Sequence, residues 1–128
     1  MDVLIVTHGT FGAALLEAAN EIVGRQPGVE ALGLPLREGA VDLSRWVSEA
    51  LNKATSEKGL LILVDFAGGT PDNVCRRLAL GQKAAVVAGL NLPMLIHALS
   101  HRDLDLKSLA ESCLKAGQSG VRLSSCPS

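Results

Sequence analysis

Short runs of consecutive apolar residues divide the chain and predict its strands. Three of these runs lack polar alternation, and they lie at residues 3–6 (VLIV), 60–64 (LLILV) and 84–88 (AAVVA). Runs of this kind are typical of parallel strands that are buried on both faces. A weaker fourth run at 29–34 (VEALGL) is short and ends beside Pro35. The pattern therefore predicts three or four parallel strands.

Between these runs the large apolar residues recur with the period of a helix. They predict helices over 13–23 and 41–54, each with one apolar stripe for the core. Another helix is expected to begin at Thr70-Pro71, because Thr can cap a helix and Pro is tolerated in its first turn. Strands and helices that alternate in this way predict an open α/β sheet with right-handed crossovers.

The C-terminal part predicts one more helix and one more strand. The helix lies near 106–116, and we expect Gly117 to close it. Residues 120–125 (GVRLSS) then predict an edge strand. No linker, repeat or low-complexity stretch interrupts the chain, so we expect residues 1–128 to form a single three-layer, doubly wound domain.

Composition removes several classes of partner. Hydrophobic residues make up 48% of the 128 residues, which is enough for a core, and the formal net charge is only −1. Nucleic acids and anionic membranes favour a basic face, so neither is expected as the main partner. There is no long apolar run, and no charged leader precedes an apolar stretch. We therefore expect no signal peptide, no membrane insertion and a cytoplasmic protein.

Two of the predicted strands end in residues that can perform chemistry. The first strand runs into Thr7-His8-Gly9, and the third runs into Asp65. Open parallel sheets bind ligands beyond the carboxyl ends of their strands. If these two strands are neighbours, His8 and Asp65 face each other at one edge of the sheet. A carboxylate beside one imidazole nitrogen fixes the tautomer and leaves the other nitrogen as a nucleophile.

Glycines follow both strand ends and favour an anionic reaction partner. Gly9 is expected to begin one helix, and Gly68, Gly69 and Thr70 begin another. Backbone N–H groups at helix starts bind phosphate, and glycine lets the anion approach closely. The unshielded ring of His8 beside such N–H groups therefore suggests that an anionic group reaches it.

Structural interpretations of the same residues stay open. His8 could be a hydrogen-bonded structural residue, and Asp65 could simply cap the turn that follows it. His97 and His101 stand four residues apart on a predicted helix, which is a spacing that two metal ligands can have. No third ligand presents itself, so we expect no metal site.

Three separated segments resemble the mannose-type EIIA domain of the bacterial phosphoenolpyruvate-dependent sugar phosphotransferase system. They are residues 5–19 (IVTHGTFGAALLEAA), 61–74 (LILVDFAGGTPDNV) and 89–99 (GLNLPMLIHAL), and the resemblance extends to about Ser124. It implies a parallel sheet of order 2-1-3-4, in which strands one and three are neighbours. It also implies a homodimer that exchanges a last antiparallel strand, to which the GVRLSS segment corresponds.

The resemblance implies a phosphocarrier. In this family the histidine that matches His8 takes a phosphoryl group from the carrier protein HPr and passes it to a histidine of an EIIB protein. The aspartate that matches Asp65 holds the ring nitrogen that is not phosphorylated, and the segment that matches Gly68, Gly69 and Thr70 lies beside the phosphoryl group. This scheme requires no metal and no other cofactor. The implied partners are HPr, EIIB and a second copy of the chain.

Two residues bear on how partners dock. Phe11 is an apolar residue beside the expected site and is a candidate contact. Asp72 follows the Pro of the GGTP segment, where members of the family commonly carry an apolar or aromatic residue. Its carboxylate adds negative charge near the site and favours the helix start. We therefore expect Asp72 to contact a partner and to affect which partner docks. Because the chain ends after this domain, we expect EIIB to be a separate protein.

Other functions stay open beside this one. The domain could serve a dihydroxyacetone kinase, or regulate without sugar transport. A histidine-phosphatase-like enzyme would carry Arg-His-Gly after the first strand, but Thr7 replaces the arginine, and neither His97 nor His101 lies in the right context. A domain with a degenerate site that only binds partners is a further possibility, which the intact pair of His8 and Asp65 disfavours.

Overall fold

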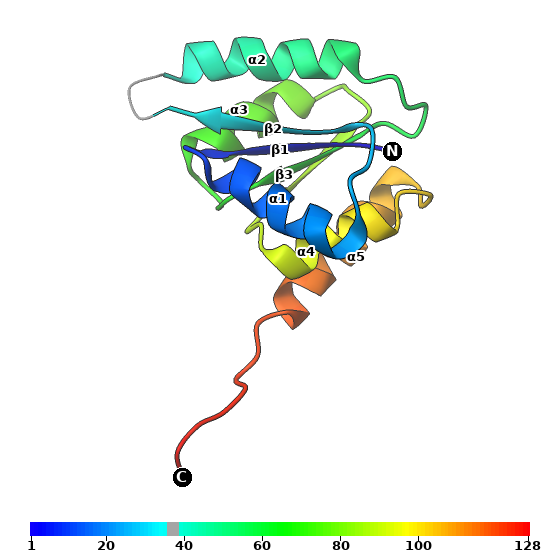
Figure 1. The fold of residues 1–128 in the computed structure, drawn as a ribbon. Helices are drawn as coiled ribbons and strands as arrows, with labels where there is room; N and C mark the ends of the chain where they lie inside the picture. Colours follow the sequence, from blue (N-terminus) through cyan, green and yellow to red (C-terminus); the bar gives the residue numbers. More distant parts are fainter. Residues whose placement is uncertain (36–38) are drawn as a thin grey trace.

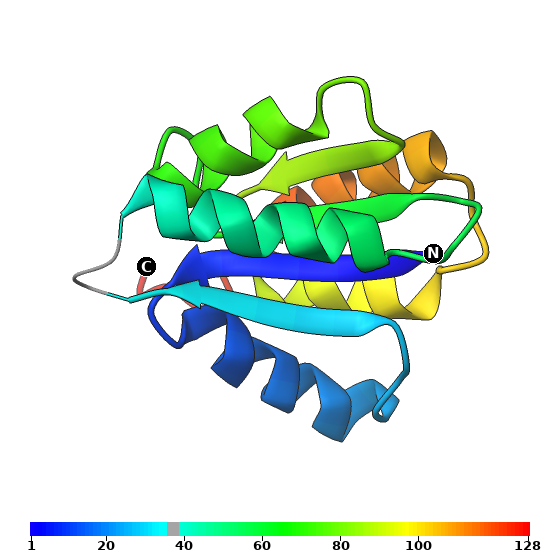
Figure 2. The same ribbon diagram turned by 90° about the horizontal axis from the view of Figure 1, so that it is seen from above.

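The computed structural model describes residues 1–35 and 39–128 of the chain. Four strands in this part form a parallel sheet in the order β2-β1-β3-β4 (Figures 1 and 2). They are β1 (Asp2–His8), β2 (Val29–Leu34), β3 (Leu60–Val64) and β4 (Ala84–Ala88). The strands and their order confirm the predicted parallel α/β sheet, in which β1 and β3 are neighbours.

Helices cover both faces of the sheet and complete the three predicted layers. Within the described residues they are α1 (Phe11–Val23), α2 (Ala40–Lys53), α3 (Thr70–Ala79), α4 (Leu92–Ser100) and α5 (Leu106–Ser119). The helices α2 and α3 pack on one face, and α1, α4 and α5 pack on the other (Figure 1). None of the described helices has both the length and the apolar character that crossing a membrane requires.

The run LLILV is apolar throughout because β3 is buried on both faces. Leu61 and Leu63 belong to the core beneath α1, α4 and α5, whereas Ile62 and Val64 belong to the core beneath α2 and α3. Complete burial of such a side chain contributes about 1.5–3 kcal/mol. The absence of polar alternation in the sequence is therefore explained by two cores that share one strand.

The C-terminal region differs from its prediction. The helix α5 continues to Ser119, and Gly117 is buried inside it rather than ending it. A Cβ at Gly117 would lie 2.6 Å from Cε of Met94, so this glycine lets α5 pack closely on α4. Residues 121–128 form neither helix nor strand in the single chain, and they extend away from the body (Figure 1). An edge strand at 120–125 is therefore not formed here, and its exchange in a dimer stays a prediction.

Candidate functional site

The imidazole of His8 and the carboxylate of Asp65 meet where β1 and β3 end side by side. The His8 Nδ1 lies 2.7 Å from Oδ2 of Asp65, and the backbone N–H of His8 donates to the same oxygen at 2.9 Å. The other carboxylate oxygen accepts the backbone N–H of Phe66 at 3.0 Å. Asp65 is therefore held by the ends of both strands, and it orients the His8 ring from a fixed position.

This contact decides which ring nitrogen can react. In neutral His8 the nitrogen that faces a carboxylate carries the proton, so the lone pair lies on Nε2. The side chain of His8 is 47% exposed, whereas that of Asp65 is only 11% exposed. The site thus combines an accessible nucleophilic nitrogen with a largely covered carboxylate behind it.

The surroundings of Asp65 keep it ionised. Burial by itself would raise its pKa, but hydrogen bonds from the His8 backbone, the His8 ring and the Phe66 backbone act in the opposite direction. The net result is a pKa of Asp65 below its ordinary value. Its carboxylate is therefore charged near neutral pH and can stabilise positive charge that develops on the ring.

Phe66 belongs to the site, although it is not among the residues that the sequence predicts for it. Its ring stacks on the His8 ring with a centroid distance of 5.4 Å and an interplanar angle of 15°. Gly69 lies against both rings, because a Cβ there would be 2.8 Å from Phe66 and 3.2 Å from Cε1 of His8. The signal in the sequence was an aromatic residue directly after a strand-end aspartate. Phe66 and Phe11 are both about half exposed, so apolar surface lies at this edge of the sheet.

Gly9 does not offer the phosphate-binding N–H that its position predicts. Its N–H donates to the carbonyl of Leu34 at 2.8 Å, at the end of the neighbouring β2. A Cβ at Gly33 would lie only 2.0 Å from the Gly9 carbonyl oxygen, so Gly33 permits this close approach. Gly9 therefore ties the end of β1 to β2, contrary to the expectation that it binds an anion.

The segment before α3 contains both occupied and available N–H groups. The N–H of Gly68 donates to Oδ2 of Asp72 at 2.9 Å. Gly69 is the N-cap of α3 and makes no side-chain cap bond, so the expectation that Thr70 caps this helix is wrong. The first N–H groups of a helix have no acceptor within it. The N–H groups of Gly69 and Thr70 are therefore the candidates for binding an anion on His8.

Asp72 is turned into the protein rather than toward a partner. It is 5% exposed, and its Oδ2 lies 3.2 Å from Nε of Arg76 in addition to the bond from Gly68. Asp72 therefore presents almost no surface for docking, contrary to the expectation that it contacts a partner directly.

The buried cysteine of α3 does not compete with His8 as a nucleophile. Burial raises the pKa of the Cys75 thiol to about 12, and the negative charge of Asp72 adds to this effect. The reactive form of cysteine is the thiolate, so Cys75 is inert near neutral pH.

The remaining histidines contact each other and the helix after them. The rings of His97 and His101 stack with centroids 4.1 Å apart, and Nε2 of His97 lies 2.9 Å from Oγ of Ser112. In residues 1–35 and 39–128, no three His, Cys, Asp or Glu side chains come together as metal ligands. Neither histidine lies with His8, as a second phosphate-clamping histidine would.

Thr7 has a structural role beside the site. Its side chain is fully buried, and its hydroxyl oxygen accepts the backbone N–H of Gly12 at 2.9 Å. This bond fixes the start of α1 against the end of β1. The side chain therefore does not stand in for the phosphate-binding arginine of a histidine phosphatase.

Comparison with known proteins assigns these features to a family. The family model EIIA-man, described as the PTS system fructose IIA component, matches residues 2–116. The PTS system fructose-specific EIIA component of Bacillus subtilis is 34% identical over 127 residues, which cover 98% of this chain and 87% of that protein. The PTS system mannose-specific EIIAB component of Escherichia coli is 33% identical over 123 residues. That match covers 94% of this chain but 38% of the Escherichia coli protein, so the chain spans less than half of that relative.

Solved structures with the same arrangement cover nearly the whole chain. The mannose/sorbose specific IIA subunit of the phosphotransferase system from Enterococcus faecalis has a TM-score of 0.91 at 27% identity, and covers 99% of this chain and 96% of its own. Phosphotransferase system component EIIA from Streptococcus agalactiae has a TM-score of 0.87, also at 27% identity, with coverages of 94% and 95%. The range matched by the family model, residues 2–116, includes His8 and Asp65.

Proposed function

Because the chain belongs to the mannose-type EIIA family of sugar phosphotransferase systems, we propose that it carries a phosphoryl group on Nε2 of His8. It accepts the group from HPr and passes it to an EIIB protein. The observation that carries the proposal is the 2.7 Å contact between Nδ1 of His8 and Asp65, with the ring still 47% exposed.

The proposed reaction is an in-line exchange between two histidines. The lone pair on Nε2 of His8 attacks the phosphorus of phospho-HPr while the bond from phosphorus to the donor nitrogen breaks. The proton on Nδ1 stays in place, and Asp65 stabilises the positive charge that the ring gains. Onward transfer to EIIB is the same exchange in reverse. Positioning and charge supply the catalysis, because the reaction requires little covalent work from the protein.

The N–H groups of Gly69 and Thr70 supply hydrogen bonds to the phosphoryl oxygens in this proposal. Gly69 lies against Cε1 of His8, the ring carbon next to Nε2, so the helix start is close to the reacting atom. The positive end of the helix dipole of α3 favours the dianion at the same place.

Docking of HPr and EIIB is assigned to the apolar surface around the ring. Phe11 is 47% exposed and Phe66 is 53% exposed. A carrier has to release each partner quickly, so a contact of modest area around these two side chains suits its role.

Dimerisation is part of the same proposal. Val121 and Leu123 are apolar, 77% and 82% exposed, and lie on the extended C-terminal segment. A second copy that pairs with this segment would cover both side chains. Light scattering should give the mass of a dimer for the full chain and of a monomer after removal of residues 120–128.

Mass spectrometry tests the assignment of His8. The chain is incubated with phosphoenolpyruvate and the two general proteins that precede EIIA in the phosphotransferase system. We expect one acid-labile phosphate on the wild type and none on His8→Gln, while the His101→Gln control is labelled like the wild type. A phosphate on His8→Gln, or an unlabelled wild type, would contradict the proposal. Capture of an EIIB protein by the labelled chain separates a transport role from service to a dihydroxyacetone kinase.

A further inference from the structure

Asp72 places a nearly buried carboxylate next to the segment that lies against the reactive ring. It accepts the N–H of Gly68 and is 5% exposed, so it is shielded from the water that weakens interactions between charges. Gly68 is followed by Gly69, which lies against Cε1 of His8. One hydrogen bond and a short stretch of backbone therefore connect Asp72 with the neighbourhood of Nε2.

A phosphoryl group on Nε2 meets this carboxylate in one of two ways. If the Gly68 N–H stays with Asp72, the dianion lacks that donor and lies near a charge of its own sign. If the N–H turns to the phosphoryl group, Asp72 loses a hydrogen bond in a site where it has little water. Its remaining ion pair is then with Arg76, whose side chain is 61% exposed. Both arrangements make the phosphorylated state less stable.

We propose that Asp72 is a positioning residue that raises the phosphoryl-transfer potential of His8. It holds the Gly68 segment in place in the free protein and makes the phosphorylated form a better donor to the next protein. Arg76 opposes this effect by partly neutralising the carboxylate. The inference rests on the proposed function, because it requires His8 to accept the phosphoryl group from HPr.

The equilibrium between the two carriers measures this potential directly. Purified phospho-HPr is mixed with the chain without phosphoenolpyruvate, and the acid-labile phosphate on each protein is quantified once the ratio is constant. In Asp72→Asn the amide oxygen can still accept the Gly68 N–H, but the charge is gone. We expect the ratio to shift about tenfold toward the phosphorylated chain, which corresponds to about 1.4 kcal/mol.

Removal of the arginine should act in the opposite direction. Arg76→Gln leaves Asp72 without its ion-pair partner, and we expect a shift of about twofold to threefold away from the phosphorylated chain, small because this side chain is exposed. A merely structural contribution to the helix start would not produce opposite signs at the two positions. Arg76 lies at the surface, so this variant tests the inference even if Asp72→Asn unfolds.

A matched control comes from the first turn of α2. Asp42 is also paired with an arginine of its own helix, with 3.5 Å between Asp42 Oδ1 and Nη2 of Arg45, but its side chain is 37% exposed and so is far less buried than Asp72. Asp42→Asn should leave the ratio within twofold of the wild type. The inference is wrong if Asp72→Asn also stays within twofold, or if Arg76→Gln shifts the ratio toward the phosphorylated chain. Failure of the proposed function itself is distinguishable, because the wild type would then take no phosphate from HPr.

Discussion

Asp2 lies where the parallel strands begin, at the amino edge of the sheet, and Asp65 lies where they end, at the carboxyl edge. Each aspartate accepts hydrogen bonds from two backbone N–H groups. Asp65 accepts from His8 and Phe66, whereas Oδ2 of Asp2 accepts from Thr55 at 3.0 Å and from Ser56 at 3.4 Å. Only Asp65 also holds an imidazole ring. A pair of backbone hydrogen bonds to an aspartate therefore closes a loop at the amino edge, and at the carboxyl edge it holds the carboxylate that orients the His8 ring.

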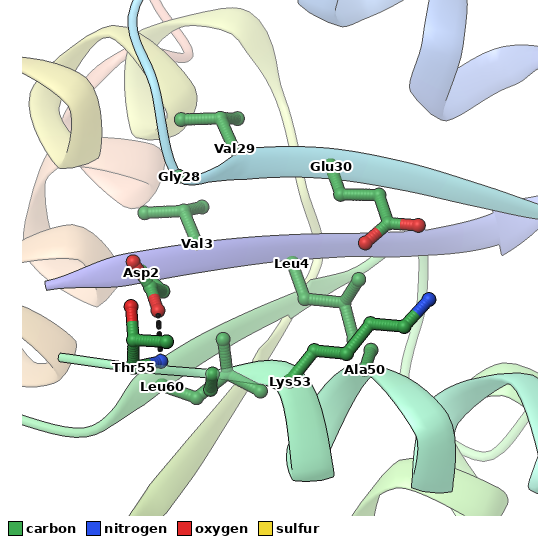
Figure 3. Close-up of a pocket in the computed structure, with 11 residues that line it drawn as sticks. Asp2, Val3, Leu4, Gly28, Val29, Glu30, Ala50, Lys53, Thr55 and Leu60 are labelled. Carbon is green, nitrogen blue, oxygen red and sulfur yellow. Dashed lines mark hydrogen bonds between the residues drawn. The ribbon is translucent and has the colours of Figure 1, made fainter.

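The amino edge contains a cavity of the described part of the chain. A cavity of about 330 Å³ lies there between the starts of β1 and β2 and the end of α2, with Asp2, Glu30 and Lys53 among its lining (Figure 3). The exposed ring of His8 lies at the opposite edge, with the ring of Phe66 stacked on it. When the phosphoryl donor is itself a protein, its own surface can enclose the reacting atoms. A phosphocarrier therefore does not need a deep pocket. An exposed, oriented nitrogen is therefore a better guide to this type of site than concavity.

Substitution of Asp65 and of Asp2 by asparagine should give the largest difference between the effects of changes at the two edges. Asp65→Asn removes the charge that fixes and supports the ring, and we expect phosphoryl transfer from HPr to slow by about 10²-fold or more. Asp2→Asn should leave the rate within twofold and lower the free energy of unfolding by about 1 kcal/mol. Rapid-quench labelling gives the rates, and urea unfolding gives the stabilities. Equal slowing in both variants would mean that Asp65 acts only through the fold.

Alanine substitutions at two glycines, one at each edge, test how a displaced backbone affects stability and phosphoryl transfer. A Cβ at Gly33 would lie 2.0 Å from the Gly9 carbonyl oxygen, and a Cβ at Gly59 would lie 2.4 Å from that of Lys83. We expect both alanine variants to lose about 1–3 kcal/mol of stability in urea unfolding. Gly33→Ala should also slow phosphoryl transfer by about tenfold, because it displaces the backbone that follows His8. Normal transfer in folded Gly33→Ala would show that the contact with Gly9 does not position the ring.

Arg102 should contribute only stability. Its guanidinium donates to the carbonyl of Met1 at 2.8 Å, to that of Pro27 at 2.6 Å and to the side chain of Gln26 at 3.2 Å. Arg102→Ala should lower the free energy of unfolding by about 1–2 kcal/mol, because several amino-edge acceptors lose their donor. The transfer rate of the folded protein should stay within twofold of the wild type. A larger change in rate would connect the two edges and contradict their independence.

The smallest expected difference is in how the stability of the fold changes as the pH falls. The lowered pKa of Asp65 stabilises the fold above about pH 4, and this contribution is lost as the pH falls further toward the folded pKa. Burial, and then the charge of His101, lowers the pKa of His97, so the unfolded chain takes up this proton first. That loss of stability begins already as the pH falls below about 6.5.

Stability measured against pH distinguishes these two groups. His97→Gln should flatten the curve just below about pH 6.5, whereas Asp65→Asn should flatten it only below about pH 4. Both groups are partly exposed, so we expect changes of no more than about 1 kcal/mol. The assignment of the two windows would be overturned if His97→Gln altered only the more acidic one.

Much of the architecture could be predicted from local patterns. The runs at 3–6, 60–64 and 84–88 lie within the observed strands, because strands buried on both faces must be apolar throughout. The predicted helix over 41–54 differs from α2 by one residue at each end. The weaker run at 29–34 is also a strand, although it is an outermost strand of the sheet.

The misplaced details depended on contacts between distant segments. Glycine often ends helices, but Gly117 lies inside α5, where its lack of a side chain leaves room for Met94. Gly9 precedes a helix, yet its N–H is taken by Leu34 of the neighbouring strand. Asp72 follows the helix start, but its carboxylate bends back to Gly68. The type of a residue limits the roles that it can have. The neighbours that pack against it determine which of these roles it takes.

Local sequence patterns were enough to predict the alternation of strands and helices, and with it the positions of His8 and Asp65 at strand ends. Apolar runs and helical periodicity can be read from neighbouring residues alone. Three features of the site follow from the packing of the folded chain: Nδ1 of His8 faces the carboxylate, Phe66 covers one face of the ring, and Asp72 accepts the N–H of Gly68. Hydrogen bonds and ring contacts act over a few ångströms between residues far apart in the chain. Their partners therefore exist only once the strands are side by side.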